Sequence, residues 1–258
     1  MPVIALLTDF GHQDPYVGQM KGAILRHAPG TTLVDLCHEV RPQDVGHGAF
    51  ILEASHAHFP SQTIFVCVVD PGVGTDRAIL LAFWNNQWFL APDNGLLDFL
   101  RADHALWWRL TPPPGVSSQT FHARDIFAPM AARLSRGVTP DSLGTRTTLP
   151  GRVHAVQKPA ATRTAESISC RVLHVDRFGN CLLNLPIHPL AKHWRLVSGH
   201  VVEVVGTYAD IPPGQAGLIA GSQGVMELAM NQASCAQRLG LVPGDTVALE
   251  HRPQQERP

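Results

Sequence analysis

The 258-residue sequence lacks several features that each indicate a particular class of protein. It has no apolar run of membrane length, so it predicts no membrane-spanning helix. Its 20 basic and 21 acidic residues leave a net charge of −1, which argues against binding nucleic acid through a basic face. The first residues lack the basic region of a signal peptide and soon reach an acid, Asp9. These absences favour a cytoplasmic enzyme or binding protein.

Cysteine is also scarce, and its spacing excludes common cysteine motifs. The five cysteines, at positions 37, 67, 170, 181 and 235, are odd in number and contain no CxxC pair. Such cysteines are typical of small buried hydrophobic side chains in a reducing compartment. His56 and His58 are two residues apart, so they do not share a helix face, and no cysteine or carboxylate cluster accompanies them. The sequence therefore predicts no metal site.

Hydrophobic residues make up 45% of the chain, which is enough for a sizeable core. In the first 70 residues, apolar strand-like runs alternate with helical patterns. Strands are expected over 3–7, 32–36 and 63–69, and helices over 15–26 and 44–56. This alternation predicts an α/β fold whose N-terminal sheet is mostly parallel, flanked by helices and joined by right-handed crossovers.

The pattern changes after this region. A hairpin is expected over 78–91 and a helix over 126–134, and residues 138–166, rich in Pro, Thr, Gly and Arg, are expected to link two domains. We therefore predict an N-terminal α/β domain over 1–150 and a C-terminal antiparallel β-barrel domain over 151–258. The barrel is predicted from short strand-like runs at 167–175, 181–185, 201–205, 217–220, 225–229 and 246–250.

The stretch over 63–77 contains the first candidate site. Its β-branched and apolar run predicts a strand that is buried on both faces, and the run stops at Asp70. Pro71 and two glycines then predict a tight turn before Arg77. In an open α/β sheet, ligands bind beyond the carboxyl ends of the strands, where this prediction puts Asp70. An Asp-Pro-Gly turn with no functional role is the alternative.

Other polar groups occupy comparable positions. Asp9 follows the first predicted strand, where it is either a turn residue or a carboxylate that receives two vicinal hydroxyls such as those of ribose. His122 precedes a predicted helix, where it either packs at the helix entrance or takes part in a site. Polar turns at 176–180 and 221–224 interrupt the second domain. Each of these features alone is weak support for a site.

Six motifs occur in order along the chain: LTDFG at 7–11, VDPGVGT at 69–75 with Arg77, APDNGLL at 91–97, HARDIFAP at 122–129, DRFGN at 176–180 and NQAS at 231–234. Together they resemble the S-adenosyl-L-methionine (SAM) hydroxide adenosyltransferase family, relatives of the fluorinase and chlorinase. The resemblance spans about residues 3–247. It implies an α/β domain joined to a β-barrel, a homotrimer with active sites between subunits, and a reaction of SAM with water that gives adenosine and L-methionine.

The resemblance also implies roles for individual residues. Asp70, Arg77 and His122 match the set that activates water. Two positions depart from the family pattern: Ala123 replaces the usual glycine, and Gln223 stands where the fluorinase has arginine. The remaining matches are Asp9 to the ribose hydroxyls, Asp176 and Asn180 with Phe178 to the amino-acid end of methionine, Ser222 to the methionine carboxylate and, by a weaker alignment, Tyr208 to the adenine.

The chemistry of these residues suits water as the nucleophile. The SAM sulfonium makes methionine a good leaving group, and the attack is at the ribose C5′. Asp70 can accept a proton from water, while Arg77 and His122 can stabilise hydroxide character. The same carboxylate repels a halide, which argues against a halogenase. SAM is the substrate, so no cofactor is expected. The alternative from another class is a non-catalytic sensor that binds adenosine or SAM.

Overall fold

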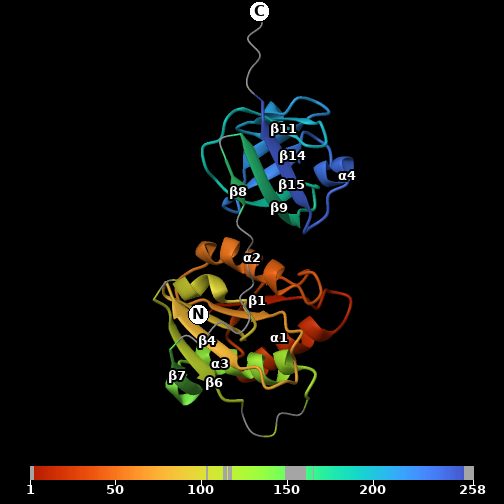
Figure 1. Cartoon of the computed structure of the whole chain (residues 1–258). Coiled ribbons are helices and arrows are strands. Elements are labelled where there is room, and N and C mark those ends of the chain that lie inside the picture. The colour runs from red at the N-terminus through yellow and green to blue at the C-terminus, as the bar shows by residue number, and fades with distance from the viewer. Residues whose placement is uncertain are drawn as a thin grey trace, which may run out of the picture. The chain divides into compact units, whose positions relative to one another are not determined.

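The computed structural model describes residues 3–102, 104–112, 115, 118–148, 161–164 and 166–252. The chain divides into two compact units, Met1–Gln157 and Lys158–Pro258 (Figure 1). The predicted boundary between residues 150 and 151 lies outside the described residues and stays a prediction. Within the described parts of the chain, no helix is both long enough and apolar enough to span a membrane.

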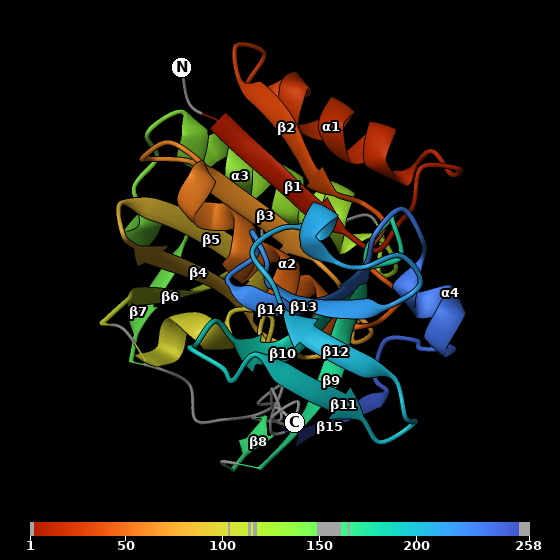
Figure 2. The same cartoon turned by 90° about the horizontal axis from the view of Figure 1, so that it is seen from above.

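The described part of the N-terminal unit is built on a sheet of seven strands in the order β2-β1-β3-β5-β4-β6-β7 (Figure 2). The pairs β1–β2, β1–β3 and β3–β5 are parallel, and the remaining pairs are antiparallel. This arrangement confirms the predicted α/β class with a mostly parallel beginning. The strands are β1 (Val3–Thr8), β2 (Thr32–Cys37), β3 (Ile64–Val68), β4 (Ile79–Trp84), β5 (Gln87–Pro92), β6 (Leu106–Leu110) and β7 (Gly144–Thr147).

Helices cover both faces of this sheet, with α2 on one face and α1 and α3 on the other (Figure 1). Successive side chains of a strand point to opposite faces, so Ile4 and Leu6 of β1 belong to the core that includes α1 and α3, whereas Ala5 and Leu7 belong to the core that includes α2. With both faces covered, the carboxyl ends of the strands are where polar ligands can approach. The helices are α1 (Tyr16–His27), α2 (Val45–Ser55) and α3 (Ala128–Ser135), with short turns η1 (His56–His58), η2 (Asp98–Ala102), η3 (Ala123–Phe127) and η4 (Pro140–Ser142).

The predicted hairpin is confirmed, and part of the predicted linker is wrong. Asn85 and Asn86 join β4 to β5 with φ angles of 48° and 58°, as a tight hairpin turn with positive φ at both positions requires. Residues 140–147, predicted as linker, instead form η4 and β7. Gly144 lies so close to β6 that an added Cβ would be 2.2 Å from the Arg109 carbonyl oxygen. Strand β7 has no buried residue, so hydrophobic periodicity could not reveal it.

The C-terminal unit is a closed barrel, as predicted. In its described residues, β10 pairs with both β14 and β9, so the seven strands from β9 to β15 form a ring, and β8 extends it beside β9. All neighbouring pairs are antiparallel except β12–β13. The strands are β8 (Thr162–Arg163), β9 (Ser167–Val175), β10 (Cys181–Pro186), β11 (His193–Leu196), β12 (Val201–Val204), β13 (Ala216–Ala220), β14 (Val225–Met230) and β15 (Thr246–His251).

One barrel strand, β11, is missing from the sequence prediction. It pairs with β12 and β15 and so closes the ring. Its inward side chains are Trp194 and Leu196, which alternate with His193 and Arg195. Only two apolar residues in four leave a weak strand signal. The unit also contains η5 (Tyr208–Asp210) and a short helix, α4 (Cys235–Leu239).

Candidate active site

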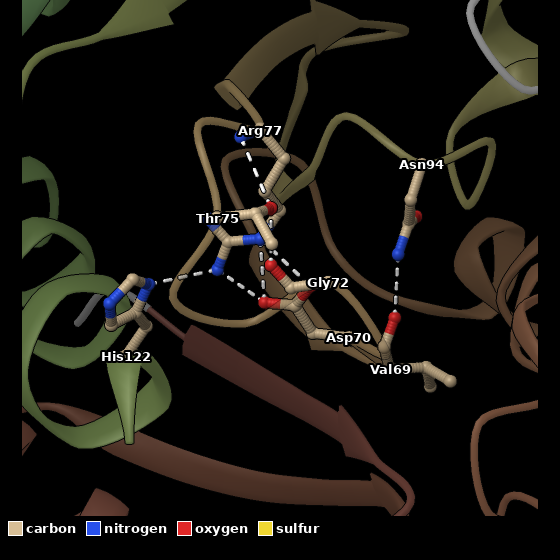
Figure 3. Close-up of polar contacts among 7 residues, drawn as sticks. All are labelled: Val69, Asp70, Gly72, Thr75, Arg77, Asn94 and His122. Carbon is tan, nitrogen blue, oxygen red and sulfur yellow. Dashed lines mark hydrogen bonds and ion pairs between the residues drawn. The ribbon is translucent and has the colours of Figure 1, made fainter. Parts of the chain in front are cut away.

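The loop after β3 begins the candidate site. β3 is buried along its whole length, and Asp70 follows two residues after its end. The Asn94 side-chain amide donates to the Val69 carbonyl at 2.8 Å, which ties this strand end to the turn after β5 (Figure 3). Within the loop, the Thr75 hydroxyl donates to the Gly72 carbonyl at 2.7 Å. The loop is therefore held by its own turns and by a neighbouring strand end.

Asp70 and Arg77 form a nearly buried ion pair across this loop. The Arg77 Nε donates to both carboxylate oxygens of Asp70 at 2.8 Å, and its Nη2 also donates to Oδ2. The two side chains are only 4% and 9% exposed, respectively. The Arg77 guanidinium also lies over the Phe127 ring, 5.8 Å from its centroid. A two-point charged contact of this kind fixes the orientation of both groups.

His122 extends the pair into a chain of three residues. Its Nδ1 lies 3.0 Å from Arg77 Nη2 (Figure 3). Arginine can only donate, so Nδ1 accepts and the imidazole proton is on Nε2. Burial and the positive charge of Arg77 lower the pKa of His122, although the charges of Asp70 and Asp125 oppose this shift. The imidazole is therefore neutral near pH 7 and presents an Nε2–H donor.

A glycine allows the two parts of this chain to meet. Gly74 has a φ of +82°, and an added Cβ would lie 2.7 Å from the carbonyl oxygen of Gln119. The loop after β3 thus packs directly against the segment that leads to His122. That segment enters α3 through η3, a π-helical turn that begins right after His122. Such turns are frequent at functional sites.

Asp9 lies at the same edge of the sheet but makes different contacts. It follows β1, whose last residue, Thr8, is in register with Val68 of β3. The Asp9 Oδ2 accepts a hydrogen bond from the Gln43 backbone N–H at 2.8 Å. Gln43 has a φ of 64°, a strained value for a residue other than glycine, and such strain gathers at functional sites. Sequence reasoning missed Gln43, because no pattern marks a left-handed glutamine.

The second unit carries its own polar cluster, built on the turn between β9 and β10. The Asp176 Oδ1 accepts from the backbone N–H groups of Phe178 and Asn180 at 2.9 and 2.8 Å. Its Oδ2 accepts from the Asn180 side chain at 2.9 Å. Asn180 is buried, whereas Phe178 is 77% exposed. Gly179 permits this turn, because its φ is +85° and an added Cβ would meet Ser234.

Tyr208 belongs to the same region of the barrel. Its hydroxyl donates to Glu227 Oε2 at 2.8 Å. Burial and the negative charges of Glu227 and Asp176 raise the pKa of Tyr208 to about 12. Sequence reasoning missed Glu227, a 4% exposed acid in an otherwise apolar strand, although that isolation is the signal that could have identified it. Ser222 is exposed in the turn between β13 and β14.

The predicted residues therefore fall into two groups. Asp70, Arg77 and His122 contact one another, and Asp9 lies at the same sheet edge without bonding to them. The other five, Asp176, Phe178, Asn180, Tyr208 and Ser222, belong to the barrel unit. In the described residues, no group of three or more His, Cys, Asp or Glu side chains could hold a metal ion.

Comparison with known proteins gives consistent matches over both units. The family model described as the SAM hydroxide adenosyltransferase N-terminal domain matches residues 4–144, and that of the C-terminal domain matches residues 170–248. The (R)-S-adenosyl-L-methionine hydrolase of Thermus thermophilus is 35% identical, covering 96% of this chain and 100% of the relative. The fluorinase of Nocardia brasiliensis is 27% identical and covers 96% of this chain and 97% of the relative.

Solved structures also resemble the whole chain. An uncharacterised conserved protein from Thermotoga maritima has a TM-score of 0.86 and 29% identity, covering 96% of this chain and 100% of that one. A conserved hypothetical protein from Thermus thermophilus has a TM-score of 0.76 and 34% identity, covering 97% and 99% of the two chains. The likeness thus includes both the N-terminal sheet and the barrel.

Proposed function

Because the chain belongs to the SAM hydroxide adenosyltransferase family, we propose that it hydrolyses SAM to adenosine and L-methionine. The observation that carries this proposal is the chain from Asp70 through Arg77 to His122. It combines an acceptor for a water proton, a fixed positive charge and a neutral N–H donor at one strand end. Hydrolases of SAM among the relatives, 34–35% identical over 96% of this chain, support the same reaction.

The nucleophile is water, which has a pKa of about 15.7 in bulk and therefore needs assistance. In the described residues, Asp70 Oδ1 accepts a hydrogen bond only from Arg77 Nε, so lone-pair capacity remains for a water proton. The Arg77 charge and the His122 Nε2–H group stabilise the negative charge that grows on the water oxygen. Holding water against C5′ in a dry site supplies a further part of the acceleration.

The proposed reaction conserves atoms and electrons without a cofactor. The water oxygen forms a bond to the ribose C5′, while the bond from C5′ to the sulfonium sulfur breaks. The electron pair of the broken bond stays on sulfur, which becomes the neutral thioether of methionine. The proton lost from water passes to the site or to solvent. SAM therefore acts as the substrate, and its positive sulfur supplies the leaving group.

The remaining predicted residues hold the substrate in this proposal, as the family resemblance implies. Asp9 receives the ribose hydroxyls, and Tyr208 lies near the adenine. Four barrel residues contact the methionine part: Asp176, Phe178, Asn180 and Ser222. The same resemblance implies a homotrimer with active sites shared between subunits. We also propose a cytoplasmic location, which the five free thiols fit.

A chromatographic assay tests the proposal. The purified protein is incubated with SAM, with and without chloride, and the nucleosides and methionine are resolved. Adenosine with an equal amount of methionine, lost in Asp70→Ala, supports hydrolysis. Formation of 5′-chloroadenosine would instead assign a halogenase, which Asp70 disfavours because a carboxylate repels a halide. Binding of SAM without any product would make the protein a non-catalytic sensor.

A further inference from the structure

A buried histidine outside the proposed water-activating set contacts the residues on either side of Asp9. His38 follows β2 and is only 1% exposed. Its Nδ1 lies 2.8 Å from the hydroxyl oxygen of Thr8, and its Nε2 lies 3.1 Å from Asp35 Oδ1. Asp35 in turn pairs with Lys21 at 2.6 Å near the surface. A polar chain therefore runs from the surface to a fully buried threonine next to Asp9.

The direction of each hydrogen bond in this chain follows from the groups involved. The Asp35 carboxylate accepts, so the His38 Nε2 carries the proton and Nδ1 is left as an acceptor. The Thr8 hydroxyl then donates to Nδ1, and its oxygen accepts from the Phe10 backbone N–H at 3.3 Å. Burial lowers the pKa of His38, against the opposing charge of Asp35, in keeping with a neutral ring.

His38 contacts the Asp9 segment on both sides. Its side chain holds Thr8, the residue before Asp9, and its backbone carbonyl accepts from the Gly11 N–H at 2.8 Å. Gly11 has a φ of +65°, which a residue with a side chain rarely adopts. His38, the residue after β2, thus holds the turn on both sides of Asp9, while the Gln43 backbone N–H contacts the Asp9 carboxylate itself.

We propose that His38 is a positioning residue that, through Thr8 and Gly11, holds the Asp9 carboxylate in place to receive the vicinal hydroxyls of the ribose. This inference rests on the proposed function, which gives Asp9 its ribose-binding role. His38 itself touches no substrate. Removal of the imidazole breaks the bond to Thr8 and leaves the backbone bond to Gly11, so it weakens recognition of the hydroxyl pair specifically, because the carboxylate is held less firmly while its charge remains.

The test compares two nucleosides that differ only in those hydroxyls. Calorimetry on the full chain measures the dissociation constants of adenosine and 2′,3′-dideoxyadenosine. The ratio of the two constants reports recognition of the hydroxyls and cancels general effects on binding. The variants are His38→Ala and the nearly isosteric Thr8→Val, which removes the hydrogen bond to His38 and leaves the imidazole in place, and which also removes the acceptor of the Phe10 backbone N–H. The control is His56→Ala.

His56 is a matched control because it is also buried and hydrogen-bonded, with its Nδ1 3.2 Å from Gln87 Oε1. It packs against Trp84 and Phe99, among the aromatic residues of the core that includes α2. Its removal perturbs the core of the same unit without touching the turn that carries Asp9. If lower stability alone reduced the discrimination between the two nucleosides, His56→Ala would therefore reduce it as well.

We expect the wild-type protein to bind adenosine more tightly than the dideoxy nucleoside. His38→Ala and Thr8→Val are each expected to reduce this preference about tenfold, because losing the contribution of one hydrogen bond changes a binding constant by about that factor. Because both variants remove the hydrogen bond between Thr8 and His38, the double variant is expected to lose little more discrimination than Thr8→Val alone. The positioning role would be overturned if Thr8→Val kept the wild-type ratio of the two dissociation constants. It would also be overturned if His56→Ala changed that ratio as much as His38→Ala does. A wild-type protein without any preference would refute the ribose role of Asp9 and this inference with it, whereas SAM turnover tests hydrolysis separately.

Discussion

Replacing Asp70 by asparagine separates the chemistry of its carboxylate from its shape. The substitution keeps the volume and one acceptor oxygen but removes the charge that faces Arg77. It also turns a donor NH2 toward a guanidinium that already donates three hydrogen bonds to Asp70. The side chain is 4% exposed, so little water can compensate. Both the ion pair and the proton acceptor are therefore lost together.

The expected magnitudes follow from these contacts. Removing one partner of a buried pair costs about 3–5 kcal/mol of unfolding free energy, and the retained oxygen of asparagine favours the lower end of that range. Loss of a positioned proton acceptor lowers kcat about 10²–10⁴-fold. We therefore expect Asp70→Asn to lose about 3 kcal/mol of stability and about 10³-fold in kcat. This loss is smaller than the roughly 5–15 kcal/mol that stabilises a typical folded protein, so a folded population is expected to remain for the assay.

Two measurements keep these effects apart. Denaturant unfolding gives the stability, and adenosine release from saturating SAM below the unfolding transition gives kcat. The control is Asp141→Asn, because Asp141 accepts a hydrogen bond from Trp108 at 2.7 Å and the amide retains that acceptor. We expect the control to keep its kcat. A folded Asp70→Asn protein with wild-type kcat would refute the role of Asp70 at the reaction centre.

Three further predictions concern Arg77, His122 and the loop that joins Asp70 to Arg77. Arg77→Lys keeps the positive charge but cannot bridge Asp70 and His122 at once, so kcat is expected to fall about 10²-fold in steady-state assays, and an unchanged kcat would contradict the bridging role. Because the folded-state pKa of His122 is lowered, its neutral form is present above about pH 6.5 and is lost as the pH falls through the folded pKa. Activity should therefore decline only on the acid side below about pH 6.5, and a pH profile that begins to fall above it would count against a neutral His122. Gly74→Ala combines an unfavourable φ with a clash at the Gln119 carbonyl, so thermal unfolding should show a loss of about 1–3 kcal/mol, and wild-type stability would argue against the close packing of this loop.

Much of the fold could be predicted from the sequence because its signals are local. The apolar runs of β1, β2 and β3, broken by helical patterns, were sufficient to predict a parallel sheet. The hairpin expected over 78–91 could be predicted for the same reason, because two apolar runs flank a polar turn. Strands β7 and β11 escaped prediction because their pairing partners, rather than their own apolar residues, define them.

The candidate site was predictable only in part. The positions of Asp70 and Asp9 follow from strand ends, which the sequence indicates. His122 contacts Arg77 directly although the two residues are 45 positions apart in the sequence. Neither spacing nor composition specifies a contact between such distant residues. Gln43 was missed because backbone strain is a property of the folded chain, whereas Glu227 could have been identified as the single acid in an apolar run.

Isotope labelling tests the proposed reaction most directly. The protein is incubated with SAM in H₂¹⁸O, and the products are analysed by mass spectrometry. Attack of water on C5′ predicts adenosine that carries one ¹⁸O in its 5′-hydroxyl, together with unlabelled L-methionine. Methylthioadenosine as the product, adenosine without the label, or bound SAM that is never cleaved would each contradict hydrolysis at C5′.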